Sequence, residues 1–361
     1  MSLKEEALLS GVTITDVAER VGVSVATVSR FLSGFNVRQE EAIRSAIIEL
    51  NYRPSAAARN LKSGRTGTLA VIVPDITNPF FASVVKGIEQ AAGDDHMVLL
   101  VNTNNIKARE EQVLGALFGR VDGVILVPVI EEDEGPSFFS KFGLPIVLVD
   151  RITHDGESFD SVLADNAGGA RMATEHLISH GHTDIAIISG PLSTTPGKLR
   201  HDGFIQTMKS AHLPVEKTFV IEADFSQEGG FNAMRQLLNG EERPTAVFSA
   251  NNLMTIGALE AIRESGLRIP EDISIIGFDD FEMASLITPP LTVIARDAEA
   301  QGREAMEILI STISSKKQVS TQHRTIPVQL VERGSCATPR SGSSQGSSSN
   351  KLAEARTSGK N

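Results

Sequence analysis

Cysteine is almost missing from this sequence, which has only Cys336 among its 361 residues. A lone cysteine cannot form an internal disulfide, so the composition favours a protein of the reducing cytoplasm. No segment approaches the roughly 18 consecutive apolar residues of a membrane-spanning helix. Residues 1–10 are too acidic, and their apolar run is too short, for a secretory signal peptide. We therefore expect a cytoplasmic protein that does not cross a membrane.

Familiar catalytic motifs are missing as well. The sequence has no G-x-G-x-x-G, Walker A, H-E-x-x-H or G-x-S-x-G pattern, so the usual nucleotide-dependent enzymes and hydrolases lack their parts. An α/β enzyme built on Asp279 or His201 stays open as an alternative, although no nucleophile–base pair is recognisable. We expect no catalytic residue, no cofactor and no enzymatic activity.

Positive charge is scarce overall but not everywhere, since the formal net charge is −11. Residues 1–66 hold nine Lys and Arg against seven Asp and Glu, so this segment carries +2 and the remainder carries −13. A slightly basic segment ahead of an acidic body is typical of a small DNA-facing head.

The head has the pattern of three short helices. Thr13 and Asp16 match a capping box at the start of the first helix. Ser24 can cap a second helix with Leu32 on its inward side, and a third is expected over residues 39–50. Two helices joined by a tight turn, with a third closing the core, form the helix-turn-helix plan.

The start of the second helix has the side chains of a DNA recognition helix. Val25 and Ala26 lie on its outer face, where they can touch thymine methyl groups, and Arg30 can reach a guanine edge or a phosphate. Nearby hydroxyls suit phosphate oxygens, which position a helix without specifying sequence. These hydroxyls belong to Ser24, Thr27 and Ser29. An ordinary three-helix bundle with no DNA role explains the outward-facing Val25 less well.

Residues 55–62 are expected to form a hinge helix that is too short to persist alone, because an isolated helix needs about 12–15 residues. Leu61 has no obvious core to join, and Arg59 and Lys62 beside it are basic. An exposed leucine flanked by basic residues suits insertion into a DNA minor groove. A plain linker whose leucine packs on the body fits this segment equally well.

From residue 68 onward, apolar runs alternate with helical stretches. Continuous apolar runs are typical of strands buried on both faces of a parallel sheet. They fall at residues 69–73, 97–101, 123–127, 146–149, 184–188, 218–221, 246–249 and 273–277. Two successive series of such units indicate two similar lobes.

Aromatic and charged side chains follow these strands. In parallel sheets, ligands bind beyond the carboxyl ends of the strands, and with two lobes the space between them is the expected pocket. The candidates are Phe80, Phe81, Asp150, Arg151, Arg200, Phe225, Asn251 and Asp279. Flat aromatic faces with carboxylate, amide and guanidinium groups suit a sugar. Phe81 fits the core equally well.

Two other patterns are interpreted as structural. His176 and His180 are four residues apart and His182 follows, a spacing that can fit zinc. Gly181 stands where a helix should end, which favours a structural role, and we expect no metal. The acidic run at residues 131–134 is most simply a solvated loop.

The chain resembles the LacI/GalR family of bacterial regulators over nearly its whole length. The resemblance begins with V-T-I-T-D-V-A-E-R-V-G-V-S-V-A-T-V-S-R-F-L and E-L-N-Y-R-P-S-A-A-A-R-N-L-K. It continues through P-D-I-T-N-P-F-F, V-D-R, L-I-S-H-G-H, I-P-E-D-I-S-I-I-G-F-D-D and P-P-L-T to V-E-R-G. It implies an all-α helix-turn-helix head and an α/β two-lobed domain of the periplasmic-binding-protein type, with parallel sheets.

The domain boundaries follow from this resemblance and from the patterns above. We expect a DNA-binding domain over 1–54, a hinge over 55–66, an effector-binding and dimerisation domain over 67–334, and a disordered tail over 335–361. The first lobe would combine about 67–164 with 294–325, and the second about 165–293 with 326–334.

The resemblance also implies roles for individual residues. Those matching Val25, Ala26 and Arg30 contact bases, and the hinge residue Leu61 enters the minor groove. Phosphate contacts are implied for Thr13, Ser24, Thr27 and Asn36. The effector pocket is implied at Phe80, Asp150, Arg151, Arg200, Phe225, Asn251 and Asp279. One departure is that the third helix starts with Arg38-Gln39-Glu40-Glu41, where hydroxyl residues are usual. Glu40 and Glu41 would repel phosphates if they face DNA, and Arg38 can substitute for one of the phosphate contacts expected there.

We therefore predict a transcription regulator, most simply a repressor, that binds pseudo-palindromic operator DNA as a homodimer and is controlled by a sugar, a polyol or a sugar acid. The tail lacks apolar heptads, which disfavours a helical tetramer. The alternative, an extracytoplasmic binding protein with no DNA role, would suit the body but not the head.

Overall fold

The computed structural model describes residues 12–32, 34–52, 65–129, 131, 139–153, 158–315 and 320–340. Their contacts divide the chain into a small N-terminal unit, which holds the head, and a large unit that begins at Leu69. Among the described helices, none combines the length and apolar character required to span a membrane.

The head contains the three predicted helices, α2 (Ile14–Val21), α3 (Val25–Leu32) and α4 (Glu40–Glu49). The capping box is present, because the Thr13 hydroxyl accepts the Asp16 backbone N–H and the Asp16 carboxylate accepts that of Thr13. The helices enclose a small core of Val17, Ala18, Val28, Ile43, Ala46 and Tyr52. Leu32 was wrongly predicted to face inward: it is the last residue of α3 and is 37% exposed, whereas Val28, one turn earlier, is fully buried.

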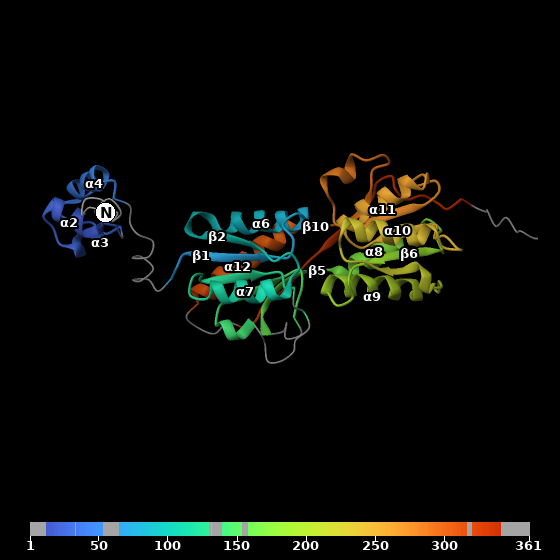
Figure 1. Cartoon of the computed structure of the whole chain (residues 1–361), viewed down its shortest axis with the longest axis horizontal. Coiled ribbons are helices and arrows are strands. Elements are labelled where there is room, and N and C mark those ends of the chain that lie inside the picture. Colours follow the sequence, from blue (N-terminus) through green and yellow to red (C-terminus); the bar gives the residue numbers. More distant parts are fainter. Residues whose placement is uncertain are drawn as a thin grey trace, which may run out of the picture. The chain divides into compact units, whose positions relative to one another are not determined.

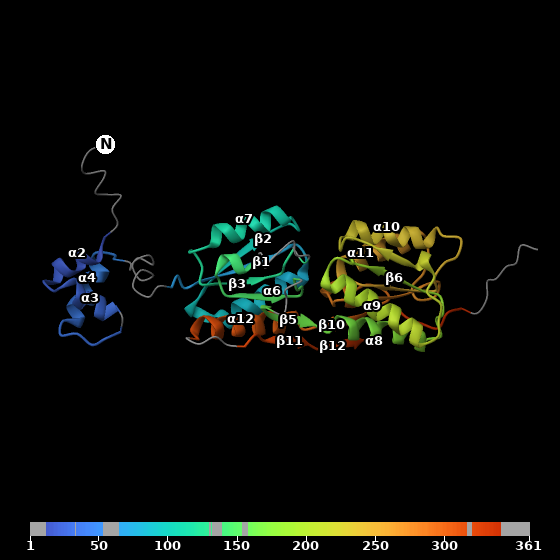
Figure 2. The same cartoon turned by 90° about the horizontal axis from the view of Figure 1, so that it is seen from below.

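The first lobe of the large unit is a six-stranded sheet in the order β11-β5-β4-β3-β1-β2. Helices α6 and α12 cover one face and α7 covers the other (Figure 2). The strands are β1 (Thr68–Val73), β2 (Met97–Asn102), β3 (Gly123–Leu126), β4 (Ile146–Val149), β5 (Asp160–Ala164) and β11 (His323–Ile326). The helices are α6 (Pro79–Ala92), η1 (Gly93–Asp95), α7 (Lys107–Leu117), η2 (Phe139–Phe142) and α12 (Ala298–Ser314).

The second lobe repeats this plan in the order β12-β10-β9-β8-β6-β7, with α8 and α9 on one face and α10 and α11 on the other (Figures 1 and 2). The strands are β6 (Ile185–Ser189), β7 (Val220–Glu222), β8 (Ala246–Ser249), β9 (Ser274–Phe278), β10 (Thr292–Arg296) and β12 (Val328–Val331). The helices are α8 (Asn166–Ser179), α9 (Thr195–Ser210), η4 (Lys217–Phe219), α10 (Gln227–Leu238), α11 (Asn252–Glu264) and η5 (Glu282–Ser285). The expected two-lobed α/β domain is confirmed.

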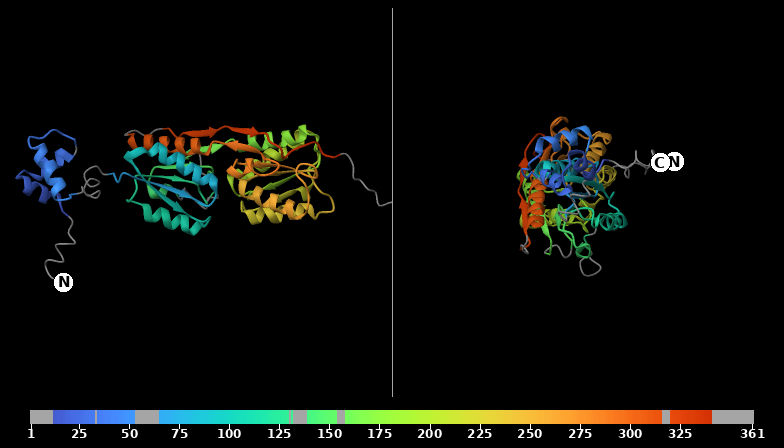
Figure 3. Two further views of the ribbon diagram at one scale, coloured as in Figure 1. Left: turned by 90° about the horizontal axis from the view of Figure 1, so that it is seen from above. Right: turned by 90° about the vertical axis from the view of Figure 1, so that its left-hand side faces the viewer.

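The chain passes between the lobes after β5, after β10 and between β11 and β12, which lie at corresponding edges of the two sheets (Figure 3). The expected boundary near residue 294 lies inside β10. Because Thr292, Val293 and Ile294 pair in parallel with β9, all of β10 belongs to the second lobe and the crossing is at Asp297.

The tail was expected to be disordered from residue 335, but its first residues are held against the second sheet although they form no regular secondary structure. Ser335 donates its hydroxyl to Ile275 and accepts the Thr292 backbone N–H, while the Ala337 N–H donates to Ser274. Residues 335–340 therefore pack along β9. The residues from 341 onward lie outside the described part of the chain.

Candidate functional site

A cavity of about 680 Å³ lies between the carboxyl ends of the two sheets in the large unit. The structure brings all eight sequence-predicted pocket residues to its wall: Phe80, Phe81, Asp150, Arg151, Arg200, Phe225, Asn251 and Asp279. Both lobes contribute, because parallel strands end at the same edge of each sheet. The carboxyl-end rule therefore located this cavity from the sequence alone.

Arg296 was missed by the sequence analysis, yet it connects two of the predicted residues. Its guanidinium donates from Nη1 to Oδ1 of Asp150 at 2.5 Å and from Nε to Oδ1 of Asp279 at 2.6 Å. Asp150 follows β4 in the first lobe and Asp279 follows β9 in the second, so this Asp150–Arg296–Asp279 bridge joins the lobes. All three side chains are almost fully buried.

The charge balance of the bridge is visible in the pKa of Asp150. Burial alone would raise that pKa, but the neighbouring guanidinium groups of Arg296, Arg200 and Arg151 bring it below its ordinary value. Asp150 is therefore ionised, and its negative charge is compensated within the protein.

Arg200 lies deepest in the wall and is 1% exposed. It donates from Nε to Oδ1 of Asn166 at 2.8 Å and from Nη1 to the carbonyl oxygen of Ala250 at 2.7 Å. Burial lowers the pKa of Arg200 to about 10, so the group stays charged at neutral pH. Its Nη2 has no hydrogen-bond partner among the described residues, which leaves a donor for a ligand oxygen.

Aromatic rings form two sides of the cavity. The Phe80 ring lies 3.5 Å beneath the Arg296 guanidinium carbon, a cation–π contact that holds the ring in place. The Phe225 ring lies against Gly190, where a Cβ atom would come within 2.0 Å of the ring. Any larger residue at position 190 would therefore displace Phe225.

Two asparagine side chains at the edge of the cavity, those of Asn251 and Asn78, cap helices. Asn251 caps α11 through its side-chain oxygen, which accepts the Met254 backbone N–H, so only its amide nitrogen is left for a ligand. Asn78 caps α6, and its Oδ1 also accepts the Asn252 side-chain amide at 3.0 Å across the two lobes.

Glu131, expected in a solvated loop, is instead buried between the lobes. Its Oε2 accepts both the backbone N–H and the hydroxyl of Thr195, the first residue of α9, at 2.5 Å. The Arg151 guanidinium lies 3.8 Å from the other carboxylate oxygen. The sequence could not indicate that Glu131, one of four consecutive acidic residues, would bind the N-terminus of α9 in the other lobe.

Replacing Glu131 with glutamine is expected to stabilise the protein near pH 8 by up to about 3 kcal/mol. Burial raises the pKa of Glu131 from 4.5 to about 7, so the group's contribution to stability is fully present below its unfolded pKa and is lost as pH rises through 7. Glutamine keeps the acceptor without the charge. Urea unfolding at acidic and alkaline pH measures the effect, with Glu222→Gln, at an exposed carboxylate, as the control. Equal pH dependence of the Glu131→Gln variant and the parent would contradict it.

The DNA-binding candidates lie on the surface of the head. Thr13, Ser24, Val25, Ala26, Arg30 and Asn36 are exposed, whereas Thr27 and Ser29 are half-buried. Ser24 accepts the Thr27 backbone N–H and so caps α3 as predicted. Glu40 pairs with Arg44 one turn later at 3.0 Å, which compensates its charge. Arg59, Leu61 and Lys62 lie outside the described residues.

Comparison with known proteins agrees with this architecture. Residues 13–55 match the bacterial regulatory proteins of the lacI family, and residues 174–336 match the periplasmic binding protein-like domain. The ribose operon repressor of Escherichia coli K12 is 37% identical over 329 residues, which cover 90% of this chain and 99% of the repressor. The transcriptional repressor PurR of Glaesserella parasuis is 36% identical over 333 residues, covering 90% and 98% of the two chains.

Solved structures show the same fold. The Lac repressor dimer bound to operator and the anti-inducer ONPF has a TM-score of 0.82 at 29% identity, covering 91% of this chain and all of that one. A LacI family regulator from Enterococcus faecalis with bound ribose has a TM-score of 0.67 at 29% identity, covering 76% of this chain and all of that one. With relatives this similar over almost their full length, the chain belongs to the lacI family of bacterial regulatory proteins.

Proposed function

We propose that this chain is a transcriptional repressor whose operator binding is controlled by a neutral monosaccharide, a pentose of the ribose class, held in the cavity. The carrying observation is that the cavity's cations are already paired. Arg296 pairs with Asp150 and with Asp279, and Asp279 also lies 4.0 Å from Arg200. The third guanidinium of the wall, that of Arg151, lies 3.8 Å from the Glu131 carboxylate. A phosphate or carboxylate ligand would need an unpaired guanidinium, whereas sugar hydroxyls need only partnered acceptors and single donors.

The rest of the wall supports the same ligand class. Phe80 and Phe225 offer apolar faces for the C–H groups of a sugar ring, and the free Nη2 of Arg200 offers a donor to a ring or hydroxyl oxygen. The E. coli relative is the ribose operon repressor and the E. faecalis neighbour holds ribose, which favours a pentose. The sequence left the effector open among sugars, polyols and sugar acids, and these observations favour a neutral sugar over a sugar acid.

Calorimetric titration of the full chain tests the ligand. D-Ribose is expected to bind more tightly than ribose 5-phosphate, gluconate or hypoxanthine, by about tenfold or more, since each of those would leave a buried polar group unpaired. Phe225→Ala should weaken ribose binding by about tenfold or more through loss of the ring face. Phe231→Ala, which removes an aromatic ring of α10 that is not among the described cavity residues, serves as the matched control. Tighter binding of a charged or purine ligand would reject the pentose.

The control of DNA binding depends on both units of the chain, the head and the large unit. We propose that two chains pair through their large units and present two heads to a pseudo-palindromic operator. The similar Lac repressor was solved as a dimer bound to operator, which supports this proposal. Sugar binding changes the closure of the lobes and thereby the spacing of the hinges at residues 55–62. By linkage, operator DNA must change sugar affinity by the same factor.

The hinge remains a prediction that Leu61→Ala tests. The variant is expected to bind operator more weakly, by about tenfold or more, because the wedge that stabilises a kinked base step is lost. Its affinity for the sugar in the absence of DNA should equal that of the parent. Gel shift and calorimetry measure the two quantities, and unchanged operator affinity would remove the hinge from the mechanism.

A further inference from the structure

The three histidines near the end of α8 do not act together. His182 uses both ring nitrogens for structure, since Nδ1 lies 2.8 Å from Oγ1 of Thr245 and Nε2 lies 2.9 Å from the carbonyl oxygen of Ala337. It therefore fastens residues 335–340 to the second sheet and has no nitrogen left for a ligand. His176 and His180 are not used in this way.

His176 and His180 instead meet a carboxylate from a distant part of the chain. They lie one turn apart on α8, with ring centroids 4.5 Å apart. Glu332 follows the last residue of β12, the strand on which α8 packs. Each of the three residues places one ligand-type atom within 4.8 Å of the other two. We propose that this His176–His180–Glu332 cluster is a binding site for a divalent transition metal of the zinc class.

The protonation of the two histidines suits a metal. Nδ1 of His180 lies 2.9 Å from the carbonyl oxygen of His176, so Nδ1 carries the proton and Nε2 has the lone pair that a metal requires. His176 is 8% exposed, and its Nε2 is buried without a hydrogen-bond partner among the described residues. A buried imidazole nitrogen with no partner is costly, and coordination would satisfy it.

The donor set selects the type of ion. Two imidazoles and one carboxylate favour zinc, nickel or cobalt over magnesium and calcium, which prefer all-oxygen sites. The nearby Cys336 is not a competing ligand, because burial raises the pKa of its thiol to about 11 and its Sγ donates to the Ile275 carbonyl. Three protein ligands leave a coordination position for water, so the ion would be exchangeable.

The position of the site indicates what a bound ion would do. His180 is the C-cap of α8, where the helix dipole favours a cation. At its other end, α8 starts with Asn166, whose Oδ1 accepts a hydrogen bond from Nε of Arg200 in the cavity wall. An ion joining the last turn of α8 to Glu332 would therefore brace the helix whose first residue, Asn166, holds the cavity residue Arg200.

Cobalt and zinc titration of the tag-free, chelator-treated full chain tests the proposal. One ion per chain is expected, with visible cobalt absorption of an imidazole-containing site and a melting temperature that rises with zinc. His180→Ala and Glu332→Gln should each weaken zinc binding by about tenfold or more. Both positions lie nearer the surface than His176, so these variants are expected to fold.

The control is His96→Ala, which removes a histidine of the first lobe and should leave zinc affinity unchanged. Failure of the parent to bind zinc or cobalt at one ion per chain would overturn the site. Retention of parental zinc affinity by both His180→Ala and Glu332→Gln would overturn it as well. Neither result depends on sugar or DNA binding, so the metal site and the repressor function fail separately.

Discussion

The Arg296→Met variant is expected to lose about 3–5 kcal/mol of free energy of unfolding, because removing one partner of a buried ion pair leaves the other charge without compensation. Here two carboxylates, Asp150 and Asp279, would be left in a site where their side chains are about 5% and 4% exposed. The Phe80 ring would also lose the guanidinium that covers it. Urea unfolding at neutral pH measures the loss.

A second variant separates charge from packing. Asp150→Asn combined with Arg296→Met removes one buried charge of each sign and keeps Asp279 beside Arg200 at 4.0 Å, so this double variant should regain most of the lost stability. It should still bind ribose poorly, because the Asp150 carboxylate, an acceptor for a sugar hydroxyl, is gone.

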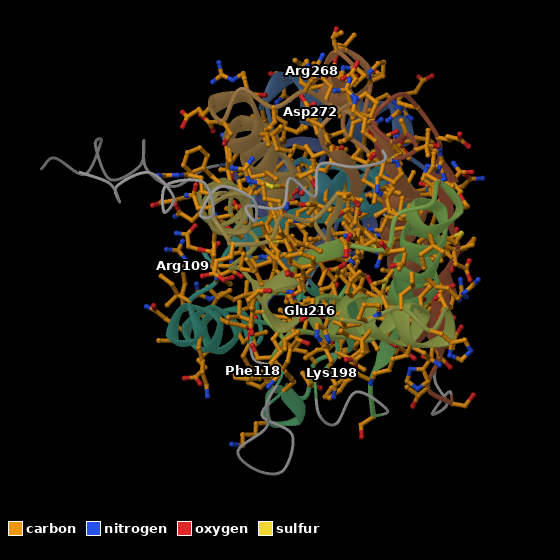
Figure 4. The ribbon with its side chains drawn as sticks, turned by 90° about the vertical axis from the view of Figure 1, so that its right-hand side faces the viewer. Arg109, Phe118, Lys198, Glu216, Arg268 and Asp272 are labelled. Carbon is orange, nitrogen blue, oxygen red and sulfur yellow. The ribbon has the colours of Figure 1, made fainter. Side chains whose placement is uncertain are left out.

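The matched surface control is Arg268→Met. Arg268 forms a bidentate ion pair with Asp272, as Arg296 does with Asp279. The Arg268–Asp272 pair, however, lies at the surface of the second lobe (Figure 4). Solvent screens such a pair, so only a small change in stability is expected there. Equal losses for Arg268→Met and Arg296→Met would contradict a special role for the buried bridge.

The Val25→Glu variant is expected to lose operator affinity by about hundredfold or more, because each lost base contact costs about 1–3 kcal/mol and a dimer carries two heads. Val25 begins α3 and is 41% exposed, so the substitution spares the core of the head. It removes an apolar contact and places a negative charge where the phosphate backbone would approach. Fluorescence anisotropy with promoter DNA of the chain's own operon, at fixed salt, measures the loss.

The control for Val25→Glu is the same change on another helix of the head. Ile48 on α4 is 74% exposed, so Ile48→Glu alters net charge equally without touching α3. It should retain most of the operator affinity, and both variants should bind ribose like the parent. A similar loss for both would mean that charge alone, and not the face of α3, governs DNA binding.

Features that depend on neighbours in the chain were predictable from the sequence. The capping box of Thr13 and Asp16 involves residues three apart, and the strand at β1 is a continuous apolar run. The cavity residues were also predictable, because all of them except Arg200 stand just beyond a strand or at a helix start, and the topology of parallel sheets brings those points together. Arg200 lies one turn further along, inside α9. Local pattern and general topology were enough for the fold class and for most of the cavity wall.

Only the tertiary structure decided the features that join distant parts of the chain. Arg296 meets Asp150 across 146 positions, and His182 meets Ala337 across 155. The same holds for Glu131 against Thr195 and for Glu332 against His176. No short pattern encodes such contacts, because whether a charged residue is solvated or buried depends on which partner folding brings to it. The sequence by itself therefore determined the architecture and the class of site, and the packing of the two lobes determined which charges are paired within it.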